Sequence, residues 1–202
     1  MHSIRRTPVS AAESRSVAGI AAGADLQISR AAIVELAAHR GRTLELTASA
    51  AGHGCALPPL GRAAISAEQL ALGVRPGRWL VLQPRDARAT AWAQWETMCG
   101  PAGTAVDLSS GLAVLQLYGH EARAVLARSC RLDLDPKQFP TGHAAATIVA
   151  QVSTVIVARP RGMLLLTPST TARHFCEWLL ATGRPFGIGS PWDVSLSQLL
   201  AE

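Results

Sequence analysis

The sequence predicts an α+β fold made of two similar halves, each with the ferredoxin-like order β-α-β-β-α. The first observation behind this prediction is composition. Of the 202 residues, 49% are hydrophobic and 16% are charged, which suits a folded chain with one core or two small fused cores. The second is repetition, because similar segments recur about 80 residues apart. Chance similarity between two Ala- and Leu-rich stretches is the alternative to a true duplication.

Each half opens with a strand that ends before a glycine. The opening strands are expected over residues 25–36 and 107–117, and the glycines are Gly41 and Gly119. Helices are expected after the glycines, over residues 42–51 and 121–128. In the second of these helices the apolar residues recur at helical spacing, so its pattern is the clearer one.

The later part of each half also repeats. Arg75–Pro84 and Arg159–Pro168 both combine a turn, an apolar strand and a proline that ends the strand. Helices that carry tryptophan are expected next, over residues 89–98 and 171–180. A further strand is expected before each turn, a weak one over 65–72 and a single long one, rich in Val and Ile, over 147–158.

The domain organisation follows from these elements. Residues 1–22 are rich in Arg, Ser and Ala and are expected to be a flexible N-terminal tail. Residues 23–182 are expected to form a single domain of two pseudo-repeats, at about 23–100 and 103–182. Residues 183–202 are expected to be a C-terminal interface tail. The apolar residues expected to contact a partner there are Phe186, Ile188, Trp192, Leu196 and Leu199.

Charge does not point to a nucleic-acid partner. The formal net charge is +5, but Lys137 is the only lysine and the arginines are scattered, with no block of like charges. The chain also lacks the run of ~20 predominantly apolar residues that a membrane-spanning helix needs. We therefore expect neither nucleic acid nor a membrane as a partner. Because the four cysteines are isolated and no secretion signal is evident, a reduced, cytoplasmic protein is expected.

No catalytic, cofactor-binding or metal-binding residue is predicted. No acidic residue occurs between Asp135 and Glu177, across the clearest strands of the second half, whereas acid–base catalysis needs paired titratable groups. Asp133 and Asp135 form the one close acidic pair, which we interpret as capping a strand end or turn rather than as a metal or acid-catalysis site. His53 and Cys55 are the only neighbouring His and Cys, with no second pair at ligand spacing.

The five tryptophans stand out against one tyrosine and three phenylalanines. Two interpretations stay open: stacking on a flat ligand such as a pterin or a base, and filling of the core. Core filling accounts for Trp79 and Trp178, which lie on an expected strand and helix. Trp192 lies among polar residues and is typical of an interface anchor.

Two adjacent stretches carry a family resemblance. Val106–Ala127 resembles the strand–glycine–helix segment of the glycine-cleavage T-protein superfamily, the folate-binding aminomethyltransferase fold. Ser129–Gly142 resembles one branch of it, the gamma subunits of heterotetrameric sarcosine oxidases. The residues that match the pattern of this branch are Cys130, Leu132, Asp133, Leu134, Phe139, Pro140 and Gly142. The resemblance covers about residues 25–182 and implies the fold of the folate-binding domain of T-protein.

The resemblance implies a non-catalytic, structural subunit of a flavin-dependent enzyme. Such an enzyme demethylates sarcosine to glycine, passes the one-carbon unit to tetrahydrofolate or releases formaldehyde, and makes hydrogen peroxide. The implied partners are large alpha and beta flavoprotein subunits, which carry FAD, FMN and NAD, and a small zinc-binding delta subunit. No cofactor is implied on this chain. T-protein has an aspartate where this sequence reads Ala144–Gln151, in agreement with a non-catalytic role.

Two alternatives to this function stay open. One is the gamma subunit of a related secondary-amine oxidase or dehydrogenase, such as one that acts on N-methylglutamate. The other is a stand-alone, folate-binding protein of the T-protein type. A superfamily branch involved in iron–sulfur assembly carries a Lys-Gly-Cys-Tyr-type motif, which this sequence lacks.

Overall fold

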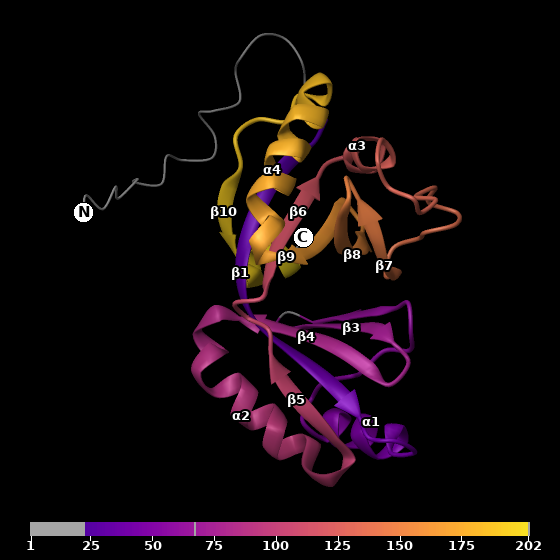
Figure 1. Cartoon of the computed structure of the whole chain (residues 1–202), viewed down its shortest axis with the longest axis vertical. Coiled ribbons are helices and arrows are strands. Elements are labelled where there is room, and N and C mark those ends of the chain that lie inside the picture. The colour runs from indigo at the N-terminus through magenta and orange to yellow at the C-terminus, as the bar shows by residue number, and fades with distance from the viewer. Residues whose placement is uncertain (1–22, 67, 202) are drawn as a thin grey trace, which may run out of the picture.

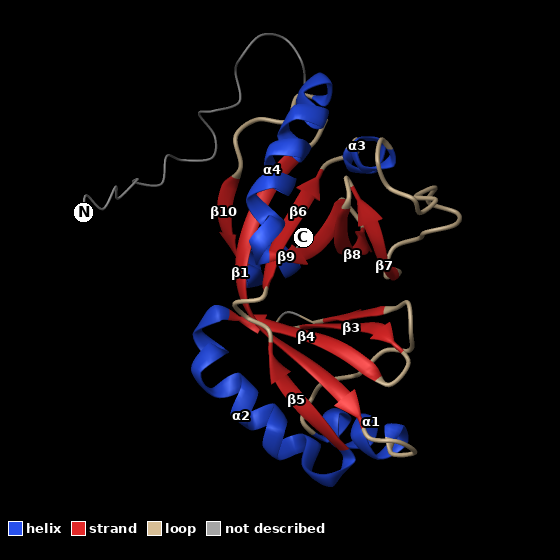
Figure 2. Cartoon of the chain, viewed as in Figure 1, coloured by secondary structure: helices blue, strands red, loops and turns tan. Residues whose placement is uncertain are grey.

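The computed structural model describes residues 23–66 and 68–201, so the predicted tail at 1–22 lies outside the described residues. The chain folds into two halves stacked on one another, with strands toward the middle and most of the helices on the outer sides (Figure 1, Figure 2). The predicted α+β class with two similar halves is confirmed.

The order of elements repeats along the chain. The first half runs through β1 (Asp25–Ala38), α1 (Thr43–Gly52), β2 (Ala63–Ile65), β3 (Leu70–Arg75), β4 (Arg78–Pro84), α2 (Arg88–Cys99) and β5 (Gly103–Asp107). The second runs through β6 (Leu112–Tyr118), α3 (Ala122–Ala127), β7 (Ala144–Val149), β8 (Val152–Arg159), β9 (Gly162–Pro168), α4 (Ser169–Gly183), β10 (Trp192–Ser195) and α5 (Leu196–Ala201). Short 3₁₀ turns occupy Arg85–Ala87, Gly100–Ala102 and Arg184–Phe186. Both halves therefore contain the expected β-α-β-β-α order. The first half adds β2 and β5, and the second adds β7, β10 and α5.

The prediction of one long strand over 147–158 is wrong. The chain reverses at Ala150 and Gln151, which have φ angles of 48° and 67°. Val149 pairs with Val152, so β7 and β8 form a hairpin with a two-residue turn. Turns of this kind usually contain Asn or Gly, because both central residues take positive φ. The apolar pattern here continues through the turn without such a residue, and the sequence gives no sign of the reversal.

Strand β1 belongs to both halves. The sheet order is β2-β3-β4-β1-β6-β9-β8-β7, with β5 and β10 also paired to β1. Residues 25–29 of β1 pair with β6, and residues 34–38 pair with β5. Figure 1 shows β1 running from the half that contains α4 into the half that contains α2. Between the two ladders, the Ile33 N–H donates to Ser109 Oγ at 3.0 Å, so the backbone stays bonded where β1 crosses.

The two ends of the strand order also meet. Ala144 N–H donates to Gly61 O and Ala63 N–H donates to Gly142 O, both at 2.9 Å. These bonds flank an isolated bridge between Arg62 and His143. The edges of β2 and β7 are thereby joined at one point, and the halves are connected on this side as well as through β1.

Three apolar clusters fill the molecule. One lies between α3, α4 and the second-half sheet, around Leu117, Val125 and Phe175. Another lies between α1, α2 and the first-half sheet, around Leu46 and Trp95. The third lies between the two sheets and contains residues of both halves together with three leucines of α5 (Ile33, Leu72, Leu82, Val114, Val157, Leu164, Leu166, Leu196, Leu199 and Leu200). The C-terminal segment is thus part of the core.

Candidate functional site

Three of the five predicted interface residues lie inside the chain's own core. Leu196 is 1% exposed and Leu199 is fully buried between the sheets. Ile188 is 8% exposed and packs on Gly183, where an added Cβ would lie 2.1 Å from Ile188 Cδ1. The prediction of a C-terminal interface tail is wrong for these residues. The physical reason is that β10 extends the sheet by pairing in parallel with β1, and the apolar face of α5 then covers the inter-sheet space.

The other two predicted interface residues lie at the surface or near it. Trp192 is 37% exposed and starts β10, which has β1 as its neighbour among the described strands. Phe186 is half-buried, and the Arg128 guanidinium lies over its ring, 5.3 Å from the centroid. Their contact with a partner stays a prediction.

The tryptophans on the expected strand and helix fill the core. Trp79 is buried and its Nε1–H donates to Pro58 O at 2.7 Å. Trp178 is half-buried and stacks on Phe175, with ring centroids 6.0 Å apart. Core filling is therefore confirmed for these two residues.

The candidate polar residues serve local structure. Asp133 Oδ1 accepts the Asp135 N–H and Asp135 Oδ1 accepts the Lys137 N–H, at 2.9 and 2.8 Å, which confirms the turn-capping interpretation. His53 Nδ1 lies 2.9 Å from Ser49 O, whereas Cys55 is buried, which raises the pKa of its thiol to about 11. Among the described residues, no three His, Cys, Asp or Glu side chains lie close enough together to hold a metal ion.

The segment that carries the family resemblance is held by one arginine. Arg123 of α3 donates through Nη1 to Leu134 O and to Phe139 O, the latter at 3.0 Å. The side chains of Leu134 and Phe139 are themselves buried in the core under α3. The loop from α3 to β7 runs along the outer side of β7 (Figure 2). The backbone of Cys130 pairs with that of Val149 in an isolated antiparallel β-bridge at the end of β7. The matching residues therefore act by fixing the shape of this surface loop.

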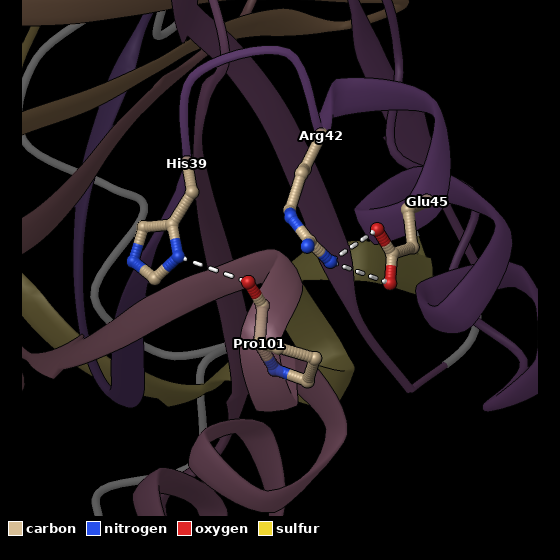
Figure 3. A network of polar contacts seen from close by, with 4 residues as sticks. All are labelled: His39, Arg42, Glu45 and Pro101. Atoms are coloured by element: carbon tan, nitrogen blue, oxygen red, sulfur yellow. Dashed lines mark hydrogen bonds and ion pairs between the residues drawn. The ribbon is translucent and has the colours of Figure 1, made fainter.

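In the first half, two arginines form ion pairs near the end of β1 and the start of α1. Arg42 Nη1 donates to both carboxylate oxygens of Glu45, at 3.2 and 2.9 Å (Figure 3). His39, beside it, makes a 3.0 Å hydrogen bond from Nδ1 to Pro101 O, which ties the turn after β1 to the segment after α2. Arg78 on β4 pairs with Glu35 on β1 at 3.1 Å. Arg42 and Arg78 are thus each paired with a carboxylate.

Two buried polar residues were missed by the sequence reasoning. Gln27 and Ser29 of β1 are both 4% exposed, beside β10 and on the face turned away from Leu26. Gln27 Oε1 and Ser29 Oγ accept no hydrogen bond from any described residue. The available signal is alternation: polar residues stand at every second position of an otherwise apolar strand, which places them on one face.

Comparison with known proteins gives the family. The family model described as "Sarcosine oxidase, gamma subunit family" matches residues 40–182. The chain belongs to the sarcosine oxidase gamma subunit family. The match includes α1, the whole first-half sheet beyond β1 and the loop held by Arg123, and it ends within α4.

Individual relatives agree with this family. The chain is 31% identical over 136 residues to a sarcosine oxidase subunit gamma from Arthrobacter sp., covering 66% of each protein. It is 32% identical over 79 residues to the same subunit from Corynebacterium sp. strain U-96, covering 39% of the chain and 38% of the relative. The chain thus matches less than two thirds of the length of each of these gamma subunits.

Solved structures agree with the fold of the gamma-subunit family. A chain of heterotetrameric sarcosine oxidase from Corynebacterium sp. U-96, in complex with pyrrole 2-carboxylate, superposes with a TM-score of 0.74 at 24% identity, covering 88% of this chain and 92% of that one. The aminomethyltransferase T of the Bartonella henselae glycine cleavage system superposes with a TM-score of 0.64 at 19% identity, covering 87% and 49%. The T-protein-like fold is therefore confirmed. None of the described helices is both long and apolar enough to cross a membrane.

Proposed function

We propose that this chain is the non-catalytic, structural gamma subunit of a cytoplasmic, heterotetrameric, flavin-dependent sarcosine oxidase. The observation that carries the proposal is the family match over residues 40–182. In the proposed reaction, sarcosine, water and dioxygen give glycine, formaldehyde and hydrogen peroxide. When tetrahydrofolate accepts the one-carbon unit, methylenetetrahydrofolate forms in place of formaldehyde.

The proposed cofactors belong to other subunits. FAD, FMN and NAD are assigned to large alpha and beta subunits, and zinc to a small delta subunit. The described residues of this chain do not fit zinc, because their His, Cys, Asp and Glu side chains form no group of three. The space between the sheets is occupied by the leucines of α5, so it does not suit a bulky flavin.

The proposed contact to a larger subunit includes Trp192 at the outer edge of β10. Trp is enriched among residues that dominate binding energy at protein interfaces, because a large apolar surface is removed from water there. Trp192 is exposed. It begins the short strand β10, which pairs in parallel with β1. Phe186, which is half-buried under Arg128, lies earlier in the same segment.

The test is purification of the tagged full chain from its native host, with measurement of native mass and visible absorbance. We expect a yellow complex far heavier than 21.2 kDa that produces hydrogen peroxide from sarcosine. A colourless species near 21.2 kDa would contradict the proposal, and tetrahydrofolate binding by the lone chain would then favour the stand-alone alternative. Peroxide formation or dye reduction with N-methylglutamate but not sarcosine would favour the related amine enzymes.

A matched pair of variants tests the proposed contact. Trp192→Asp places a charge at the predicted interface and should reduce the recovered flavin complex about tenfold or more, in line with the loss of a major interface residue. Leu44→Asp is the control, because Leu44 is also exposed but lies on α1 in the first half. Circular dichroism of both variants shows that they are folded. Equal recovery of the complex with both variants would rule out Trp192 as a contact.

A further inference from the structure

A pocket of about 340 Å³ lies where the C-terminal segment of the chain meets the end of β4. It is bordered by β1, by β10 and by the 3₁₀ turn that leads from β4 into α2. Figure 1 shows β10 alongside β1, above the start of α2, and the pocket lies in this region. The charged residues that line it, among those the structure describes, are Arg30, Arg85, Asp86 and Asp193. We call it the mixed-charge pocket.

The charges of this pocket are not paired with one another. All four side chains are exposed, and none forms an ion pair or a hydrogen bond with another described residue. Elsewhere in the chain, arginines that lie within reach of a carboxylate do pair, as Arg42 pairs with Glu45 and Arg78 with Glu35. The mixed-charge pocket therefore presents both signs of charge without neutralising either.

The strand register keeps one pair of opposite charges apart. Asp193 of β10 lies opposite Ile28 of β1, and Ser195 lies opposite Arg30. Alternate residues of a strand point to the same face, so Arg30 and Asp193 share a face. They are offset by two residues, which is roughly 7 Å along the strand direction. Because backbone pairing sets this offset, a molecule with one negative and one positive group can lie between the two side chains.

The rest of the lining suits a small ligand. Ile28 and Pro84 are half-buried and Leu196 is 1% exposed, so the base of the pocket is apolar. Arg85 and Asp86 add a second pair of opposite charges from the 3₁₀ turn. The volume is at the lower end of the range of small-molecule sites, which favours a ligand much smaller than a nucleotide.

We propose that the mixed-charge pocket binds a small zwitterion, an amino acid with a free ammonium group and a free carboxylate. The carboxylate lies against Arg30, because a planar guanidinium donates two parallel hydrogen bonds to such a group. The ammonium group lies against Asp193, which accepts a charge-assisted hydrogen bond. A ligand with one charge would pair with one side chain and meet a like charge from the other, so the lining selects against simple anions and cations.

The proposal does not rest on the proposed function. Trp192 and Asp193 are consecutive residues of β10, so their side chains point to opposite faces of the strand. The pocket and the proposed contact of Trp192 with a larger subunit therefore lie on different faces. Failure of the assembly test would leave this binding site untouched, and failure of the binding test would leave the assembly proposal untouched.

The test measures ligand binding by the purified full chain. Glycine and γ-aminobutyrate are titrated separately, and acetate and methylammonium are the probes with a single charge. Ionic strength is held constant with sodium chloride, and binding is followed by calorimetry. We expect saturable binding of at least one zwitterion, and binding at least about tenfold weaker for each single-charge probe, because each loses one charge-assisted hydrogen bond. The tighter zwitterion gives the preferred spacing between the two charged groups.

The thermal unfolding midpoint is a second measurement. A ligand that binds the folded state raises the midpoint in a saturable way. Small solutes that are excluded from the protein surface also stabilise proteins, without a specific site. The rise in the wild-type chain is therefore compared with the rise in variants of the pocket at the same ligand concentration.

Three variants make the test specific. Arg30→Gln and Asp193→Asn each remove one exposed charge of the pocket, and each should weaken binding of the zwitterion about tenfold. Asp193→Asn should not weaken binding of acetate, because it removes a repulsive charge. Arg42→Gln, which removes an exposed cation on the N-terminal side of α1, is the control and should leave all binding unchanged.

Three results would overturn the proposal. The first is that neither zwitterion binds the wild-type chain saturably. The second is that acetate or methylammonium alone binds as tightly as the preferred zwitterion. The third is that Arg30→Gln and Asp193→Asn bind the zwitterion as tightly as Arg42→Gln does.

Discussion

The two halves share an order of elements but protect their sheets differently. In the first half, α2 covers the outer edge of β5: Trp92 Nε1–H donates to Ala105 O at 2.9 Å, and Ala105 N–H donates to Glu96 Oε2 at 3.3 Å. In the second half, the loop after α3 covers one end of the β7 edge through the Cys130–Val149 bridge. An unpaired strand edge is a template for unwanted pairing. The comparison teaches that a repeated backbone can satisfy this requirement with unrelated side chains.

The helix anchors differ as well. In the second half, Phe175 of α4 is completely buried against the sheet. At the corresponding distance from the proline that ends the preceding strand, α2 carries Ala91, which is also buried. The first-half helix relies instead on Trp95, whose Nε1–H donates to Gln83 Oε1 at 3.0 Å. The second-half helix α4 is therefore anchored by the apolar ring of Phe175, whereas the first-half helix α2 is anchored by the packing and the hydrogen bond of Trp95.

The largest expected change in stability comes from substituting the buried residues that anchor α4 and α2 to their sheets. Phe175→Ala should lower the free energy of unfolding by about 3–5 kcal/mol, because it opens a cavity in a fully buried layer. Ala91→Gly at the corresponding place in α2 should cost only about 1 kcal/mol, the usual helix penalty of glycine. Urea denaturation followed by circular dichroism measures both. A smaller loss for Phe175→Ala than for Ala91→Gly would show that α4 is not anchored as described.

An intermediate effect concerns the turns. Gln151→Gly should raise the free energy of unfolding by about 1 kcal/mol, because Gln151 has a φ of 67° and glycine accepts this conformation without the Cβ clash. Gly77→Ala should lower it by a similar amount, since Gly77 has a φ of 66° on the turn between β3 and β4. The same denaturation series tests the two opposite signs. Stabilisation by Gly77→Ala would contradict the argument.

The smallest effect at neutral pH concerns the first-half thiols. Burial raises the pKa of Cys55 to about 11, and burial together with the charge of Glu96 raises that of Cys99 to about 11. An unfolded thiol ionises near pH 8.5, so between about pH 8.5 and pH 11 the unfolded chain binds fewer protons than the folded one. Stability should therefore fall as pH rises through this window and be unaffected below it.

The thermal unfolding midpoint, measured across this pH window, checks the expectation. The double variant Cys55→Ala, Cys99→Ala should show a shallower alkaline decline than the wild type. Its midpoint at pH 7 is the reference for each protein, because the substitutions also change packing. Parallel declines above pH 8.5 would show that these thiols do not contribute.

The sequence allowed the order of the elements to be predicted because glycines and prolines mark their ends. Pro84 and Pro168 close β4 and β9 where expected. The resemblance carried by Ser129–Gly142 pointed to the family that the family model gives. The strand β5 was missed because it is short and follows a 3₁₀ turn that contains Pro101. The burial of Leu196 was missed because it depends on space between two distant sheets, which no local pattern reports.

The candidate site was less predictable than the fold. The lack of acidic residues between Asp135 and Glu177 was visible in the sequence. That Arg123 and Arg161 line the same pocket was not. These two residues lie on separate connections and meet only after β6, β8 and β9 have paired. The sequence shows that the arginines are spread along the chain, but it does not show which of them lie close together in the folded protein.

Strand β1 makes the two halves inseparable in a topological sense. Its first residues complete the second-half sheet, and its last residues complete the first-half sheet, while β5 and β6 continue alongside it in the opposite direction. A cut near residue 100 would leave the second fragment without its central neighbour strand and the first without its edge. The second half is therefore not a self-contained module, because its sheet needs the first residues of β1.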